Sequence, residues 1–245
     1  MNMPSKEVDV LKPQWVCRVC GYNMIGTRPD VCPFCGEPHD VFLTWEEAED
    51  AYEVTATGVN DKVTQLMSVP RLGIEHAAYR VETGSGPIWI DSPSALNQDL
   101  PPVDHIFFTH PDFMGACNQY REIWSAQVHL HRLDAANPLV EKFPVDDPFD
   151  GDFVHGELEA FHIGGHTPGF TAYLFERILF ICDYVFPPDE TMHFNPYSPG
   201  LEEMRTRGDR IRTVTEGRDI ETVCGYNYVA AFDDWMPRFE RLLAA

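Results

Sequence analysis

The pattern of apolar and polar positions along the chain changes near residue 60. Beyond this point, short apolar runs are divided by turns rich in Gly, Pro and Asn, which predicts β-strands. The runs AAYRVET and PIWIDSP are separated by GSG, and this spacing predicts a β-hairpin. A second hairpin is expected from TAYLFE and RILFICD, and further strands from HIFFTH, QVHLH and TVCGYNY.

Other segments have the pattern of helices. In TWEEAEDAYEV, Thr44 is the expected N-cap, and Glu47, three positions later, completes a capping box. The segments YREIWSA, GLEEMRTRGDRIRTVTE and DWMPRFERLLAA are further expected helices. Strands that come first as hairpins and later alternate with helices imply an α+β fold in which helices cover sheets.

Length and composition narrow the class of protein. A chain of 245 residues that is 44% hydrophobic can bury one full-sized core and a small appendage. It contains no run of 18 apolar residues, so the sequence predicts no membrane span. The polar N-terminus lacks the apolar segment of a signal peptide, and we expect a cytoplasmic protein. A formal net charge of −21 repels phosphate backbones and anionic lipids, so neither nucleic acid nor membrane is an expected partner.

Four of the seven cysteines form two tight pairs near the N-terminus. Two CxxC pairs are separated by eleven residues, and in a cytosolic chain such clustering favours a metal site over disulfides. The glycines that follow Cys20 and Cys35 permit positive φ, so backbone N–H groups can point at sulfur. Four thiolates make a closed tetrahedral site for Zn or Fe, and its ligands are Cys17, Cys20, Cys32 and Cys35.

This segment resembles rubredoxin-like domains, in the shortened form found at the end of rubrerythrins. The matching residues are Trp15, CRVCGY and CPFCG. The resemblance implies that the four cysteines bind one redox-active iron and pass single electrons. Zinc ribbons share the spacing, so a structural zinc is the alternative. Aromatic residues close to the sulfurs favour iron, and these are Trp15, Tyr22 and Phe34.

Residues 60–245 resemble the metallo-β-lactamase superfamily in three segments that occur in the same order. DHIFFTHPDFMGA is similar to the family's strand that ends in T-H-x-H-x-D-H-x-G. IGGHTPGFTAYLFERILFICD is similar to G-H-T-P-G-S followed by a hairpin that ends in G-D, and TVCGYNY to a late G-H. The resemblance implies an αββα sandwich with metal ions at one edge between two sheets. The expected domains are a tail (1–14), a rubredoxin-like domain (15–44), a helical linker (45–59) and the sandwich (60–245).

The family binds two metals with five histidines and two aspartates, which polarise a carbonyl and activate a bridging water. Matched residue by residue, His110 and Asp112 correspond to a histidine and the aspartate of the first loop. His166 corresponds to the histidine of G-H-T-P-G, and Asp183 to the bridging aspartate. The resemblance thus implies that these four side chains are metal ligands.

Three departures from the family pattern weaken a dinuclear site. The first loop is two residues shorter, which deletes one histidine, and Phe113 stands where the family has the histidine after the aspartate. Tyr226 stands where the last histidine is expected. We therefore expect at most one metal, Fe or Zn, held by His110, His166 and one carboxylate, the ligand set of non-haem Fe(II) sites.

The candidate catalytic residues are Asp112, Tyr226, which can supply a phenolate, and His193, which lies in a loop rich in Pro, Tyr and Asn. Three functions remain open. The first is a redox protein in which the rubredoxin-like centre serves the metal site of the larger domain. The second is a single-metal hydrolase of thioesters or lactones. The third is a non-catalytic binding or redox-sensing module. The expected partner is a small-molecule substrate or a redox partner protein.

Overall fold

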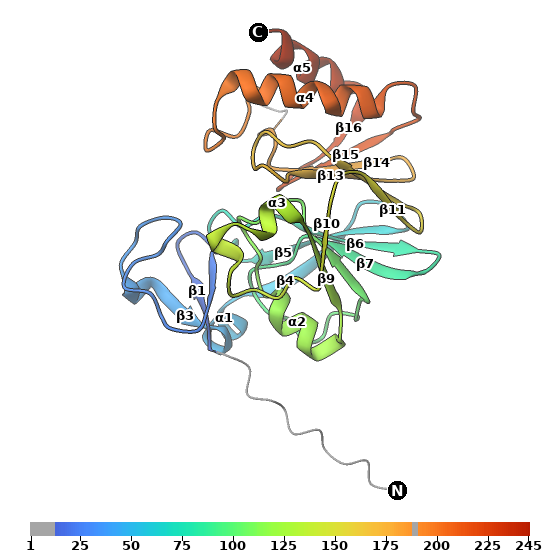
Figure 1. Ribbon diagram of the computed structural model, residues 1–245. Helices are drawn as coiled ribbons and strands as arrows, with labels where there is room; N and C mark the ends of the chain where they lie inside the picture. The colour runs from blue at the N-terminus through green and yellow to red at the C-terminus, as the bar shows by residue number, and fades with distance from the viewer. Residues whose placement is uncertain (1–12, 188–190) are drawn as a thin grey trace, which may run out of the picture.

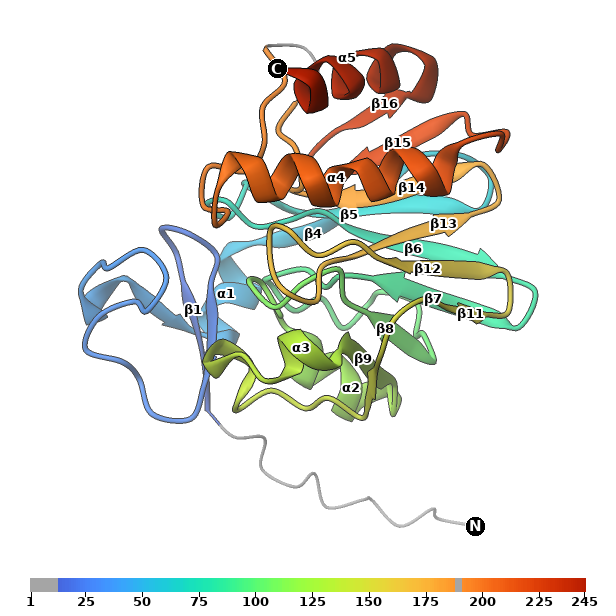
Figure 2. The same cartoon turned by 45° about the horizontal axis from the view of Figure 1, so that its top comes forward.

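The computed structural model describes residues 13–187 and 191–245, so most of the expected tail, residues 1–14, lies outside the described residues. A small three-stranded sheet is followed by two large sheets, and helices lie on both outer faces of the large pair (Figures 1 and 2). The predicted αββα sandwich with a preceding cysteine domain is therefore confirmed. No helix in the described ranges is long and apolar enough to cross a membrane.

The N-terminal cysteine domain, called the knuckle below, is built on a three-stranded antiparallel sheet in the order β2-β1-β3. Its elements are Gln14–Cys17 (β1), Asn23–Ile25 (β2), the 3-10 turn His39–Val41 (η1) and Phe42–Thr44 (β3). The strands are short, and most buried side chains of this part belong to a cluster that includes three of the cysteines. Such a small core makes the knuckle dependent on further cross-links or metal.

The knuckle leads directly into helix α1, Trp45–Ala51. The predicted capping box is confirmed, because Thr44 Oγ1 accepts from Glu47 N at 3.2 Å and Thr44 N donates to Glu47 Oε2 at 2.8 Å. The expected linker over 45–59 is helical only in its first half. Its second half contains β4, Glu53–Gly58, which pairs with the next strand at the edge of a large sheet.

The first large sheet has seven strands in the order β10-β9-β8-β7-β6-β5-β4. The β6–β7 hairpin and the strands predicted from HIFFTH and QVHLH all lie in it, and β7 to β10 run parallel. Helices α2 and α3 and the turn η2 follow β8 and β9 (Figure 1). The elements after β4 are Val63–Val69 (β5), Ala78–Thr83 (β6), Gly86–Ile90 (β7), His105–Phe107 (β8), Cys117–Trp124 (α2), Gln127–His131 (β9), Arg132–Ala135 (α3), Pro138–Val140 (η2) and Asp147–Phe149 (β10).

The second large sheet has six strands in chain order, β11 to β16. The predicted hairpin is β13–β14, and β14 pairs in parallel with β15. Two helices cover the outer face of this sheet (Figure 2). The elements are Phe153–His155 (β11), Leu158–His162 (β12), Thr171–Phe175 (β13), Ile178–Cys182 (β14), Leu201–Thr215 (α4), Thr222–Gly225 (β15), Val229–Ala231 (β16) and Phe232–Ala244 (α5).

Strand alternation sends side chains to two different cores. In β7, Ile88 and Ile90 join the core between the two sheets, whereas Trp89 joins the core beneath α2. Trp235 of α5 is fully buried against the outer face of the second sheet. The sandwich is thus held by three apolar layers, and polar side chains are placed at its edges.

Three histidines meet at the sheet edge where β8 begins. His105 Nδ1 lies 2.9 Å from His129 Nε2, and His129 Nδ1 lies 3.2 Å from Asp147 Oδ2. The ring of His155 packs on His105 with centroids 4.5 Å apart. Burial, together with the neighbouring His105, lowers the pKa of His129 from 6.5 to about 4.

This shift predicts that acid weakens the fold. Between pH 6.5 and about 4 the unfolded chain binds a proton that folded His129 does not, so stability is full above 6.5 and falls towards pH 4. We expect His129→Gln to remove about 2 kcal/mol of the loss between pH 7 and 4.5, measured by urea unfolding. The control is His39→Gln, because His39 is exposed. An unchanged pH slope in His129→Gln would contradict the prediction.

Candidate metal centres

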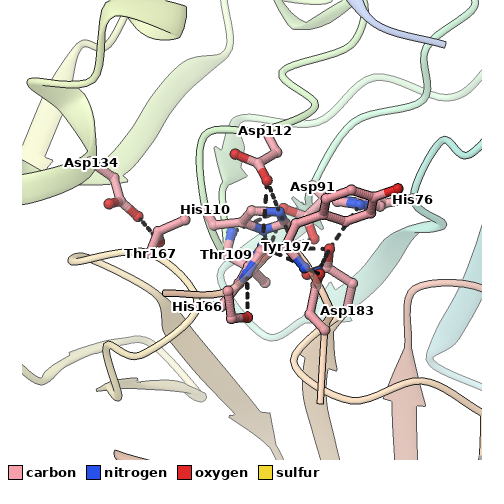
Figure 3. A network of polar contacts seen from close by, with 12 residues as sticks. His76, Asp91, Thr109, His110, Asp112, Asp134, His166, Thr167, Asp183 and Tyr197 are labelled. Carbon is pink, nitrogen blue, oxygen red and sulfur yellow. Dashed lines mark hydrogen bonds and ion pairs between the residues drawn. The ribbon is translucent and has the colours of Figure 1, made fainter. Parts of the chain in front are cut away.

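Buried histidines and carboxylates converge at one edge of the sandwich, between the two large sheets (Figure 3). The loop after β8 carries His110 and Asp112, and the loop between β12 and β13 carries His166. Asp183 directly follows β14, where Cys182 has a positive φ of 42° and the pairing with β15 shifts register. His76 lies just before β6. Four different loops therefore supply one cluster, called the His/Asp site below.

The His/Asp site contains two overlapping sets of metal-ligand type. In the first set, ligand atoms of His110, Asp112 and His166 all lie within 4.8 Å of one another. These are two of the expected histidines and one expected carboxylate. The second set is His76, His110, Cys182 and Asp183. Because His110 belongs to both, it is the centre of the arrangement.

Contacts on the far side of His110 orient its ring. Thr109 Oγ1 lies 3.0 Å from both carboxylate oxygens of Asp91 and 2.9 Å from His110 Nδ1. A threonine hydroxyl that donates to Asp91 can accept from Nδ1–H of His110, which leaves the Nε2 lone pair directed into the cluster. Burial lowers the pKa of His110 to about 4, so the ring is neutral at pH 7 and able to bind a metal.

His166 is held in a similar way. Its Nδ1 lies 3.0 Å from Ser198 Oγ, and its Nε2 lies 3.4 Å from Asp112 Oδ2 and 3.6 Å from Asp183 Oδ2. The loop that carries His166 is fixed by Asp134, which accepts from Thr167 Oγ1 at 2.6 Å and is visible beside the cluster in Figure 3. The loop geometry therefore aims Nε2 at both carboxylates.

Two atoms at the centre of the site are suited to a cation. Among the described residues, His110 Nε2 and Asp183 Oδ1 are buried without a hydrogen-bond partner, although they lie only 3.5 Å apart. Burial alone would raise the pKa of Asp183, but the imidazoles of His166, His110 and His76 lower it. A buried carboxylate beside an imidazole lone pair is costly unless an ion or proton lies between them. These donors fit one divalent metal.

His76 was not expected from the sequence. It is only 6% exposed, and its Nε2 lies 3.3 Å from Asp183 Oδ2. The predicted β6–β7 hairpin carried a signal for it. Antiparallel pairing of Tyr79 with Ile90 brings the start of β6 to the sheet edge where β7 ends in Asp91. A histidine just before β6 must therefore lie near that edge.

Of the other sequence candidates, Tyr226 and Asp112 lie beside the cluster, whereas His193 makes no contact with it among the described residues. The Tyr226 ring is edge-on to His76 with centroids 6.1 Å apart. His193 is exposed, stacks on Phe186 at 5.2 Å and places Nδ1 2.9 Å from the carbonyl of Phe194. Asp112 is the most open carboxylate of the site, with 18% of its side chain exposed. The catalytic roles of these three residues remain predictions.

The four knuckle cysteines have the geometry of a tetrahedral metal site. Their sulfurs lie within 4.8 Å of one another, with Cys17 and Cys35 3.8 Å apart and Cys20 and Cys32 3.7 Å apart. A tetrahedron with metal–sulfur bonds of about 2.3 Å has edges of about 3.8 Å, whereas a disulfide needs about 2.05 Å. The neighbouring sulfurs of Cys17 and Cys32, and then burial, raise the pKa of Cys20, so four thiolates at these distances need a cation.

The loops that present the sulfurs have the predicted backbone. Gly21 and Gly36, which follow the second cysteine of each pair, have φ of 86° and 78°. Gly21 N donates to the carbonyl of Cys17 at 2.7 Å, and Gly36 N to that of Cys32 at 2.9 Å. Each CxxCG segment is therefore a tight turn around its pair of sulfurs.

Known proteins resemble the knuckle and the sandwich separately. Residues 15–42 match the family described as the rubredoxin-like domain of rubrerythrin. No curated protein matches the chain significantly.

Solved structures resemble the larger part of the chain. A metallo-β-lactamase from Pontibacter korlensis has a TM-score of 0.62 and 17% identity, over 78% of this chain and 99% of that one. One from Hirschia baltica has a TM-score of 0.61 and 13% identity, over 77% and 97%. An archaeal superfamily protein from Sulfolobus tokodaii has a TM-score of 0.51 and 14% identity, over 68% and 79%. The chain thus joins a rubredoxin-like domain of the rubrerythrin type to a metallo-β-lactamase fold.

Proposed function

We propose that the chain is an iron-dependent redox protein in which the four-cysteine centre exchanges single electrons with one metal ion in the His/Asp site. The observation that carries this proposal is Phe113. Its ring packs on Phe34 of the knuckle at 4.8 Å and on His76 of the His/Asp site at 4.7 Å, centroid to centroid. A single buried side chain therefore contacts the surroundings of both sites.

The ligand atoms differ between the two sites, and this difference assigns a role to each site. Cys17, Cys20, Cys32 and Cys35 would hold one ion, and His110, His166 and a carboxylate would hold the other, because each set brings its ligand atoms within 4.8 Å of one another. Iron held at the sulfurs and at the imidazoles would supply one-electron redox chemistry at each site.

Aromatic residues between the two sites, and Asp112 at the His/Asp site, determine where water and small molecules have access. Phe34, Tyr22 and Phe113 pack together and exclude water between the two sites, since Phe113 is only 4% exposed. Asp112 is the more exposed carboxylate, with 18% of its side chain open to solvent, and this is the side from which a small molecule would approach the site. Electrons would enter the chain at the four-cysteine centre of the knuckle, pass to the metal of the His/Asp site and reduce a small molecule bound beside Asp112.

The test follows the visible absorbance of the thiolate-bound iron. We expect the isolated chain to be coloured, to bleach with dithionite as one-electron reductant, and to reoxidise when Fe3+ fills the His/Asp site. Phe113→Leu should slow this reoxidation several-fold at unchanged iron content, because it removes the aromatic contact between the sites. Leu139→Ala, at the edge of the same cluster, is the control. A colourless zinc protein, or reoxidation unaffected in Phe113→Leu, would refute the proposal.

The second candidate is a metal-dependent hydrolase. It is favoured by the fold shared with proteins named metallo-β-lactamases and by the exposure of Asp112, whose carboxylate would accept a proton from water if a bound metal activated it. Turnover of a thioester or lactone by the zinc-loaded chain, lost in His166→Ala, would support this function instead.

A further inference from the structure

The backbone of the knuckle packs directly against the backbone of the loop before β6, which carries His76; this contact is called the joint below. Gly73 has a φ of 60°, and a Cβ there would lie 2.4 Å from the carbonyl oxygen of Val19 and 2.5 Å from Cα of Cys20. On the knuckle side, a Cβ on Gly21 would lie 2.8 Å from the carbonyl oxygen of Leu72. Two glycines facing each other let two backbones touch without side chains between them.

A hydrogen bond closes this joint. Ile74 N donates to the carbonyl of Cys20 at 3.1 Å, so a residue of the metal-binding CxxCG turn is bonded directly to the loop before β6. The geometry of that turn is set by sulfur–metal bonds when the four-cysteine site is filled. Any change in the turn therefore reaches Ile74 through one bond.

The loop from Leu72 to His76 is also fixed from the sandwich side. Glu75 is fully buried, and its carboxylate accepts from Ser68 N at 2.9 Å, Ser68 Oγ at 3.0 Å and Ser94 N at 3.1 Å. The next residue is His76, whose Nε2 faces Asp183 at 3.3 Å. The loop thus runs, within three residues, from a bond with a cysteine of the knuckle site to a side chain of the His/Asp site.

We propose that the two metal sites are cooperative, and that the Leu72–His76 loop couples them by placing His76 as a ligand of the second metal. A filled four-cysteine site holds the CxxCG turn, the turn holds Ile74 and Gly73, and these hold His76 against Asp183. With the four-cysteine site empty, the thiols lose their tetrahedral arrangement and His76 loses one of its two supports. By linkage, metal in the His/Asp site strengthens metal binding by the cysteines to the same degree.

This inference rests on the proposed function only in that both sites bind metal, and it requires no electron transfer. Its test uses Co2+ as the probe, because Co2+–thiolate absorption reports the four-cysteine site separately from the His/Asp site. The metal-free full chain is titrated, and affinity at the His/Asp site is measured by competition with a chromophoric chelator. This affinity is compared between the parent chain, with Co2+ already bound at the thiolates, and the Cys32→Ser, Cys35→Ser variant, which lacks two of the four thiolates.

Gly73→Ala tests the joint with every ligand in place. Its methyl group must push the loop off Cys20, so we expect the affinity of the His/Asp site to fall about tenfold, as in the cysteine variant. The matched control is Gly217→Ala, at a similar φ of 70° with nothing within 4 Å of the added methyl. Gly217→Ala has the same backbone strain as Gly73→Ala but no clash with Cys20. The metal affinities of its four-cysteine site and of its His/Asp site should therefore match those of the parent chain.

The outcomes separate the two proposals. Equal His/Asp-site affinities in the parent, the cysteine variant and Gly73→Ala, with two ions bound in the parent, would overturn cooperativity and leave the proposed function intact. One ion in the parent, confined to the thiolates, would overturn both. A loss in Gly73→Ala that Gly217→Ala does not share would establish the coupling even if the cysteine variant failed to fold.

Discussion

Replacing His110 by alanine is expected to abolish metal binding at the His/Asp site and to leave one ion per chain, at the cysteines. His110 belongs to both sets of ligand-type residues, so its loss damages each of them. Without His110, neither the pair His166 and Asp112 nor the pair His76 and Asp183 keeps the imidazole that the two sets share. Neither pair alone supplies enough protein ligands to hold a divalent ion tightly. We expect the affinity for the second ion to fall by at least about 100-fold.

Elemental analysis of the purified variant checks this expectation. His162→Ala is the matched control, because the His162 ring stacks on His131 at 4.1 Å and belongs to neither set of ligand-type residues. It should keep two ions per chain. Two ions retained in His110→Ala would contradict the assignment of this histidine.

Replacing Cys17 and Cys32 together by serine is expected to have the second largest effect. The double variant should lose one ion per chain and all thiolate–metal absorbance. The knuckle should also unfold, because metal binding to such small domains supplies about 10 kcal/mol of folding free energy. Its own buried cluster contains few residues besides the cysteines themselves.

Limited proteolysis measures this unfolding. We expect new cleavage within residues 13–44, while the sandwich keeps its cooperative thermal transition because, apart from Ile25, its three apolar clusters are built from residues after 44. Cys224→Ala is the control, since this thiol is buried between the sheets and outside both metal sites. A double variant with an intact, protease-resistant knuckle would show that metal is not what holds this domain.

Much of the fold could be predicted because its signals are local. Hairpins such as β6–β7 are set by alternation and by a short turn, and α1 by a capping box. The edge strand β4 lies within the expected helical linker, 45–59, and was not predicted. The EVTATG segment of β4 is mostly polar and exposed, so it carries little of the apolar alternation that marks a half-buried strand.

Some residues of the His/Asp site could likewise be predicted from local motifs, whereas others could not. Motif positions indicated His110, Asp112, His166 and Asp183, which the structure brings to one edge. His76 carries no motif, and its place depends on the register of a hairpin and on a loop held by the knuckle. Phe113 was interpreted only as a missing histidine, whereas its contacts with Phe34 and His76 join the two halves of the molecule.

Residues close together in the chain were enough to specify the cluster of four cysteines, the order of most strands and helices, and the four motif residues of the His/Asp site, because each of these depends on local pattern. The folded arrangement was needed to show that His76 joins the second site and that the cysteine turn is bonded to the loop before it. Those contacts bring together segments far apart in the chain, Cys20 with Ile74 and His76 with Asp183, and no local pattern encodes them.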